Sequence, residues 1–171
     1  GIEAPDMETY SKALNAGQYP LSVLAVTQRG TALYQKGVYG NTMTSNPRAL
    51  DVACTVLEQV TPKLRANIRA RGEELVARFK ALSSELGGLI TEVQGTGLLV
   101  SVSLHPDFKS YGAQSIEEYM RMQGVGVIHG GKNALRFTPH FMITSEEIEL
   151  IVEATRQALL NGPRRESDRA A

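Results

Sequence analysis

The sequence predicts an α/β fold, because segments with strand-like alternation are interleaved with segments of helical periodicity. Residues 98–104 alternate apolar and polar side chains, as a half-buried strand does. Residues 62–86 instead repeat their apolar side chains about every 3.5 residues, which is typical of an amphipathic helix. Both kinds of segment recur along the chain, so we expect strands and helices to share a common core.

The N-terminal third is expected to form two short strands, over residues 6–11 and 21–26, with a polar loop between them that begins at Lys12. A helix weakened by Gly30 is expected over 27–36. Asn46 suits a helix N-cap and Pro47 the first helical position, which predicts a helix over 47–60. The expected buried face of that helix consists of Leu50, Ala53, Cys54 and Leu57.

The rest of the chain is expected to begin with a long helix, which the Gly87-Gly88 pair ends. Two later helices are predicted by capping boxes, Ser115 with Glu118 and Thr144 with Glu147. The predicted strands span residues 89–93, 98–104, 125–128 and 134–138. Gly95 and Gly97 are interpreted as packing positions, and His129 and His140 as structural residues.

Composition excludes several classes of function. Basic and acidic residues number 18 each, so the net charge of zero gives no broad attraction to nucleic acid or to a membrane surface. No apolar run approaches the roughly 20 residues that span a bilayer. Three scattered histidines and one cysteine give no metal-ligand spacing. The single Cys54 is expected in the core and fits a reducing, cytoplasmic location.

Lys12 is the candidate for chemistry. A lysine at the end of a strand, beside a glycine-containing loop, presents an amine that can form a Schiff base with a carbonyl compound. Thirty residues later, the polar loop 38–47 leads into a helix start, an arrangement that suits an anion such as phosphate. A solvated surface lysine and an ordinary capped loop are the alternatives at these two places.

Taken together, these motifs resemble the class III (omega-type) aminotransferases, which are fold-type I enzymes that use pyridoxal phosphate (PLP). The resemblance runs in order from about residue 4 to about 160. It is carried by Pro5-Asp6, Ser11-Lys12-Ala13-Leu14, Pro20, Gly40-x-Thr42, Asn46-Pro47, Gln94-Gly95-Thr96-Gly97-Leu98-Leu99, Asn133-Ala134-Leu135-Arg136-Phe137-Thr138-Pro139 and Ile143-Thr144-Ser145-Glu146-Glu147.

The resemblance implies a division of the chain into two parts. Residues 1–60 would be the end of the large PLP-binding domain, and residues 61–171 the linking helix and the small α/β C-terminal domain. Because family members are far longer, we expect the chain to be a fragment, a truncated product or one piece of a split protein. The acidic partner of the PLP ring nitrogen is not identifiable before Lys12.

The resemblance also assigns roles to residues. Lys12 would carry PLP as a Schiff base and then transfer a proton, while Thr42 and Asn41 would bind the cofactor phosphate. Arg136 would bind a substrate carboxylate, with an ordinary surface arginine as the alternative. The phosphate-binding loop of this family reaches into the partner's site, which implies a homodimer. Tyr39, Gln94 and His140 depart from the family pattern, and they leave the subfamily open.

Three functions remain open on the sequence alone. The first is an aminotransferase that moves an amino group from an amine or amino acid to a 2-oxo acid. The second is an aminomutase or racemase that uses the same lysine. The third is a truncated α/β module without catalytic activity. Consumption of a 2-oxo acid separates the first from the second, and loss of a defined cofactor site identifies the third.

Overall fold

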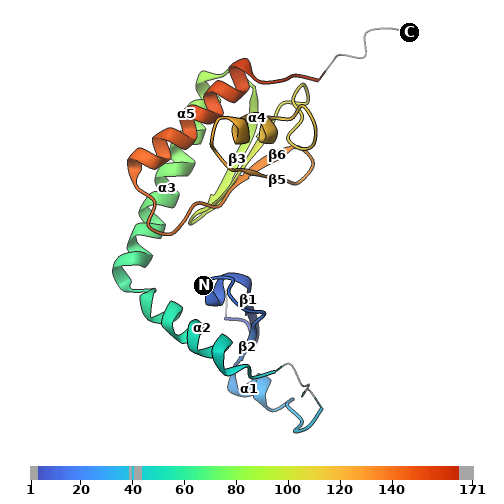
Figure 1. Ribbon diagram of the computed structural model, residues 1–171, viewed down its shortest axis with the longest axis vertical. Coiled ribbons are helices and arrows are strands. Elements are labelled where there is room, and N and C mark those ends of the chain that lie inside the picture. Colours follow the sequence, from blue (N-terminus) through green and yellow to red (C-terminus); the bar gives the residue numbers. More distant parts are fainter. Residues whose placement is uncertain (1–3, 39, 41–43, 166–171) are drawn as a thin grey trace, which may run out of the picture. The chain divides into compact units, whose positions relative to one another are not determined.

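The computed structural model describes residues 4–38, 40 and 44–165. The chain divides into two compact units, residues 1–61 and residues 62–171, which are described separately here as the first and the second unit. Figure 1 shows the order of their helices and strands. The mixture of antiparallel strands and packed helices confirms the predicted α/β class. Among the described residues, no helix has both the length and the apolar character needed to cross a membrane.

The first unit contains the expected hairpin. Strands β1 (Met7–Ser11) and β2 (Ser22–Val26) pair antiparallel, from Met7 opposite Val26 to Ser11 opposite Ser22. The 3-10 helix η1 (Lys12–Asn15) opens the connecting loop. The expected helix over 27–36 is much shorter, because α1 spans only Gln28–Thr31. A Cβ atom built on Gly30 would lie 3.0 Å from the backbone carbonyl oxygen of Asp6, just before β1. The low helix propensity of glycine agrees with the short length of α1.

Helix α2 (Pro47–Gln59) begins as predicted, since the Asn46 side chain accepts from the backbone N–H groups of its first turn. Its predicted buried face is wrong in part. The buried residues are Ala49 and Ala53, and the small side chains let the helix pack against η1. The larger neighbours on the expected face are all exposed, namely Leu50, Cys54 and Leu57. Cys54 is therefore not a core residue.

The second unit is a four-stranded antiparallel sheet with helices packed on it (Figure 1). Its strand order is β3-β4-β6-β5. The strands are β3 (Ile90–Thr96), β4 (Leu99–Leu104), β5 (Ile128–Gly130) and β6 (Ala134–Phe137). The helices are α3 (Pro62–Glu85), α4 (Ile116–Met122) and α5 (Ser145–Asn161).

Alternation along the strands decides which face of this sheet forms the core. In β4 the side chains of Val100, Val102 and Leu104 are buried, and in β6 those of Leu135 and Phe137 are buried. The residues between them face the other side of the sheet. Apolar side chains of the three helices complete the core, including Leu75, Phe79, Leu82, Ile116, Met120, Ile148, Val152 and Leu159.

Glycines allow α3 to approach the β3–β4 hairpin closely. A Cβ atom built on Gly72 of α3 would collide with the backbone carbonyl of Gly97, and one built on Gly95 would lie 2.7 Å from a methyl carbon of Val76. Gly97 itself has a φ of +53°, which favours glycine. Gly95 and Gly97 are thus packing residues, as predicted, and Gly72 is their partner.

The predicted helix caps are confirmed with one exception. Thr144 and Glu147 form a complete capping box at the start of α5. At α4 the Ser115 side chain accepts from the Glu118 N–H, but the Glu118 carboxylate accepts from Gln114 instead of closing the box. The strand expected over 125–128 lies later in the sequence, at β5, because only residues from Ile128 onward pair with β6.

Candidate functional site

The structure places Lys12 at a backbone conformation that is unusual for lysine. It directly follows β1, is the first residue of η1, and has a φ of +56°. This left-handed region costs a non-glycine residue roughly 1 kcal/mol or more, and such residues gather at functional sites. The Lys12 side chain is exposed. Lys12 is therefore an accessible amine at the turn that follows β1.

An open hollow, here called the lysine hollow, lies beside this residue. It is lined by Ser11, Lys12 and residues 17–22. Ser11 and Ser22 are opposite each other at the end of the hairpin. Gly17 has a φ of +69° and open space where a Cβ would lie, so a ligand can approach its backbone. The lysine hollow thus offers one amine, several hydroxyl groups and exposed backbone.

Asn15 holds the loop that forms the hollow, and the sequence did not point to it. Its side chain is fully buried, and its amide nitrogen donates to the Tyr19 carbonyl at 2.9 Å. Its Oδ1 atom has no hydrogen-bond partner among the described residues. Burial of an asparagine at the end of a 3-10 turn has no local sequence signal, because it depends on the packing of η1 against α2.

Asp6 is engaged structurally. Its carboxylate accepts from the Thr27 hydroxyl at 2.8 Å and from Nε of Arg29 at 3.0 Å, and it forms an ion pair with the same arginine. The hydrogen bond from Arg29, followed by that from Thr27, holds the Asp6 pKa below its ordinary value. Asp6 therefore links the residue before β1 to the start of α1 through hydrogen bonds and an ion pair.

The residues predicted to bind phosphate, Asn41 and Thr42, lie outside the described residues, and so does Tyr39. Around them the structure describes Gly40, and Ser45 with a φ of +60°. Asn46 then caps α2. The predicted phosphate-binding role of Asn41 and Thr42 stays a prediction.

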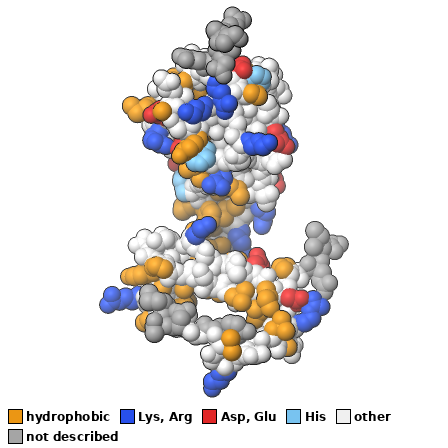
Figure 2. Space-filling model, turned by 90° about the vertical axis from the view of Figure 1, so that its right-hand side faces the viewer, with side chains coloured by type: hydrophobic (Ala, Val, Ile, Leu, Met, Phe, Trp, Pro, Cys, Tyr) orange, Lys and Arg blue, Asp and Glu red, His pale blue; other side chains and the backbone are white. Residues whose placement is uncertain are grey.

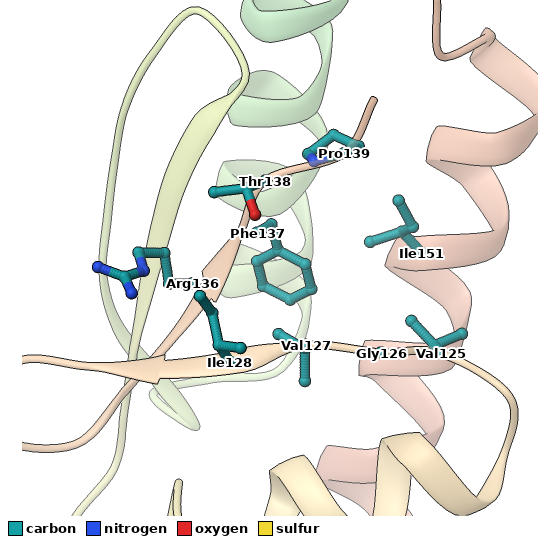
Figure 3. A pocket seen from close by; sticks show the side chains of 9 residues that line it. All are labelled: Val125, Gly126, Val127, Ile128, Arg136, Phe137, Thr138, Pro139 and Ile151. Carbon is teal, nitrogen blue, oxygen red and sulfur yellow. The ribbon is translucent and has the colours of Figure 1, made fainter. Parts of the chain in front are cut away.

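Arg136 lies in β6 of the second unit, and its side chain is exposed. It borders a small pocket whose other lining side chains are mostly apolar, among them Val127, Phe137 and Ile151. Figure 3 shows the Arg136 guanidinium pointing away from these side chains. Within the described part of the chain, no carboxylate forms an ion pair with it. Arg136 is thus a cation on the open face of the sheet.

His129 and His140 each lie beside one carboxylate. His129 Nδ1 lies 3.2 Å from the carboxylate of the buried Glu117, and His140 Nε2 lies 3.4 Å from that of Glu147. No group of three or more metal-ligating side chains occurs among the described residues. Each histidine thus lies beside one helix carboxylate of the second unit, and its structural role stays an interpretation.

Comparison with known proteins identifies the family. The sequence model of the class III aminotransferases matches residues 2–159. Succinylornithine transaminase of Citrobacter koseri is 33% identical over 145 residues, which cover 84% of this chain and 35% of that protein. The chain therefore spans about a third of the length of this relative.

Solved structures agree in fold. The acetylornithine aminotransferase of Elizabethkingia anophelis has a TM-score of 0.80 and 27% identity, over 92% of this chain and 41% of that one. The N-acetylornithine aminotransferase of Stenotrophomonas maltophilia has a TM-score of 0.74 and 28% identity, over 92% and 40%. The residues that the family model matches include Lys12 and Arg136. The chain belongs to the class III aminotransferase family, whose enzymes depend on pyridoxal phosphate.

Proposed function

We propose that this chain is the lysine-bearing part of a PLP-dependent aminotransferase, which moves an amino group from an amine or amino acid to a 2-oxo acid. The observation that carries the proposal is Lys12, an exposed amine held at a left-handed φ directly after β1. The motif that surrounds it lies within the segment matched by the family model.

The residues of the lysine hollow fit such a cofactor. PLP carries an aldehyde, which needs a primary amine, and polar substituents, which need hydroxyl groups or backbone N–H groups. Lys12 supplies the amine, and Ser11 and Ser22 supply hydroxyl groups on the same rim. The predicted phosphate contacts are Thr42 and Asn41. When bound, PLP supplies an electron sink for the negative charge that develops on the substrate carbon.

Two side chains would handle the substrate. Once the amino donor has displaced it, the Lys12 amine would accept the proton of the substrate carbon on its Nζ atom. It would then donate this proton to the cofactor. Arg136 would bind a substrate carboxylate through two parallel N–H donors, a geometry that only a guanidinium provides. The relatives named for succinylornithine and acetylornithine act on compounds that carry both an amine and a carboxylate.

We further infer a homodimer in the cytoplasm as the working form. The dimer follows from the family's phosphate-binding loop, which corresponds here to the segment around Thr42. The location follows from the single cysteine, because a chain without a disulfide framework suits a reducing compartment.

The test is to trap PLP on the purified chain with borohydride and to map the modified peptide. We expect a visible absorption band and one reduced adduct, on Lys12. The matched variants are Lys12→Ala and Lys36→Ala, which removes another exposed lysine of the same unit. The adduct should disappear in the first and persist in the second. An adduct spread over many lysines, unchanged by Lys12→Ala, would contradict the proposal.

One observation favours the alternative that the chain is catalytically inactive by itself. Both strands of the β1–β2 hairpin are exposed along their whole length. A hairpin without a covering layer is marginally stable in water, so the lysine hollow would be poorly fixed. Turnover of a 2-oxo acid by the chain alone would reject this alternative. The alternative would be supported if activity appeared only after addition of a second polypeptide that supplies the rest of a class III aminotransferase subunit.

A further inference from the structure

Arg136 belongs to a row of side chains that crosses the sheet of the second unit. In the strand register Arg136 is opposite Ser101 of β4, and Ser101 is opposite Gln94 of β3. On the other side, Arg136 is opposite Ile128 of β5. Residues directly opposite each other point to the same face, with Cβ atoms roughly 5 Å apart. The row therefore has one polar neighbour next to Arg136, which is Ser101.

The Ser101 hydroxyl is available for a ligand. Ser101 is half-buried, while its neighbours Val100 and Val102 point into the core. Its hydroxyl has no hydrogen-bond partner in the part of the chain that the structure describes. Gln94 is different, because its amide nitrogen already donates to the Glu92 carboxylate at 2.6 Å. Ser101 thus supplies the free donor closest to Arg136 along this row.

We propose that Ser101 is a second binding residue for the carboxylate received by Arg136. This inference rests on the carboxylate-binding role proposed for Arg136. A carboxylate offers about four lone-pair positions, and a bidentate guanidinium occupies two of them. The hydroxyl of Ser101 donates to a third position from the neighbouring strand. The ligand class is a carboxylate that lies flat on the open face of the sheet, over β4 and β6.

The chain contains a matched control for this proposal. Ser103 lies on the same strand, points to the same face and is also half-buried. It is opposite Glu92 and Ala134 instead of Arg136. Removal of either hydroxyl makes the same chemical change at the same face of the sheet, but only Ser101 lies opposite the guanidinium.

The experiment is an NMR titration of the full chain with glutarate, followed through the Nε–H signal of Arg136. Glutarate has carboxylates but no carbonyl group that could react with Lys12. Its binding is therefore independent of the cofactor chemistry, and a failure of that chemistry would show only in the borohydride test. We expect glutarate to shift the Arg136 signal, and Arg136→Gln to abolish binding as seen from neighbouring amides.

Ser101→Ala should weaken glutarate binding about tenfold, the usual loss for a hydrogen bond to a charged group. Ser101→Thr keeps the hydroxyl and should retain most of the affinity, and Ser103→Ala should match the unchanged chain. Equal affinities of the Ser101→Ala and Ser103→Ala variants would overturn the proposal. So would the absence of any glutarate effect at Arg136 in the unchanged chain.

Discussion

The β1–β2 hairpin and the β4–β6 strand pair contain similar apolar residues but differ sharply in burial. In the first unit the described residues that are buried are only Asn15, Gly30, Ala49 and Ala53, and side chains such as Leu24 and Val26 are exposed. Figure 2 shows hydrophobic side chains at the surface of the molecule. In the second unit one face of β4 and β6 is fully covered by helices. Strand formation therefore does not imply a core, which requires a second layer over the apolar face.

This difference has a functional consequence. Lys12, the proposed Schiff-base residue, lies in the unit with few buried residues among those described. Arg136, the proposed carboxylate-binding residue, lies on a well-packed sheet. Large exposed apolar patches mark interaction surfaces, and the β1–β2 hairpin exposes Val23, Leu24 and Val26. We therefore expect the second unit to be the more stable of the two.

The largest effect is expected from a substitution in the core of the second unit, compared with one on the exposed hairpin of the first. Phe79→Ala removes a fully buried ring that lies 4.7 Å from the ring of Phe137, and it should lower the free energy of unfolding of the second unit by about 4 kcal/mol. Leu24→Ala, at a side chain that is 56% exposed, should change stability by less than about 0.5 kcal/mol. Urea unfolding followed by far-UV circular dichroism measures both, and equal losses would remove the contrast.

A somewhat smaller loss is expected from Gly72→Ala. Alanine normally stabilises a helix interior relative to glycine, but here its methyl group would collide with the Gly97 carbonyl. We expect destabilisation of about 3 kcal/mol, because α3 must move away from the hairpin. Glu73→Ala, at an exposed neighbour on the same helix, is the control and should be nearly neutral. A stabilised Gly72→Ala variant would show that the close approach is absent.

Asn133→Ala should cost about 2 kcal/mol. Its amide nitrogen donates to the carbonyl groups of residues 104, 105 and 108, and its Oδ1 accepts from the Ser110 N–H at 3.0 Å. Loss of this side chain leaves several partly buried backbone groups unpaired. Asn161→Ala, at an exposed asparagine, should have little effect on the same unfolding curve. An unchanged free energy of unfolding in the Asn133→Ala variant would mean that the loop before α4 does not depend on these hydrogen bonds.

The smallest effect is a loss of stability in acid at the start of α5. The backbone N–H of Thr144 donates to the Glu147 carboxylate and holds its pKa below the ordinary value of 4.5. Because the folded pKa is lowered, this stabilisation is complete above about pH 4.5 and is lost as the pH falls through the folded value. The protection factors of the amides in the first turn of α5 should therefore fall in acid, and Glu147→Gln should reduce that pH dependence, while the Glu146 carboxylate, whose pKa is also lowered, keeps the rest.

Sequence patterns predicted the positions of helices and strands better than they predicted which faces of them are buried. The hairpin at β1–β2, the cap of α2 at Asn46 and the length of α3 follow from local signals and were predicted within a few residues. The buried face of α2 was not, because Leu50 and Leu57 are as apolar as any core residue. Burial depends on which element covers a face, and periodicity alone does not contain that information.

In the candidate site, too, the sequence predicted the positions of residues better than their conformations and neighbours. The position of Lys12 at the end of a strand followed from the sequence, but its left-handed φ and the buried Asn15 behind it did not. Arg136 was predicted on a strand, but its pairing with Ser101 depends on the register between β4 and β6. Strands 30 residues apart pair through the packing of the whole unit, so no local motif specifies this neighbour.

Hydrogen exchange on the 171-residue chain tests the central contrast most directly. The amides of β4 and β6 should be protected by the full stability of the second unit, because their exchange requires its unfolding. The amides of β1 and β2 should exchange much faster, since the side chains of both strands are exposed among the described residues. Protection of the hairpin equal to that of β4 and β6 would contradict the account, because it would show that the first unit is stable without a partner.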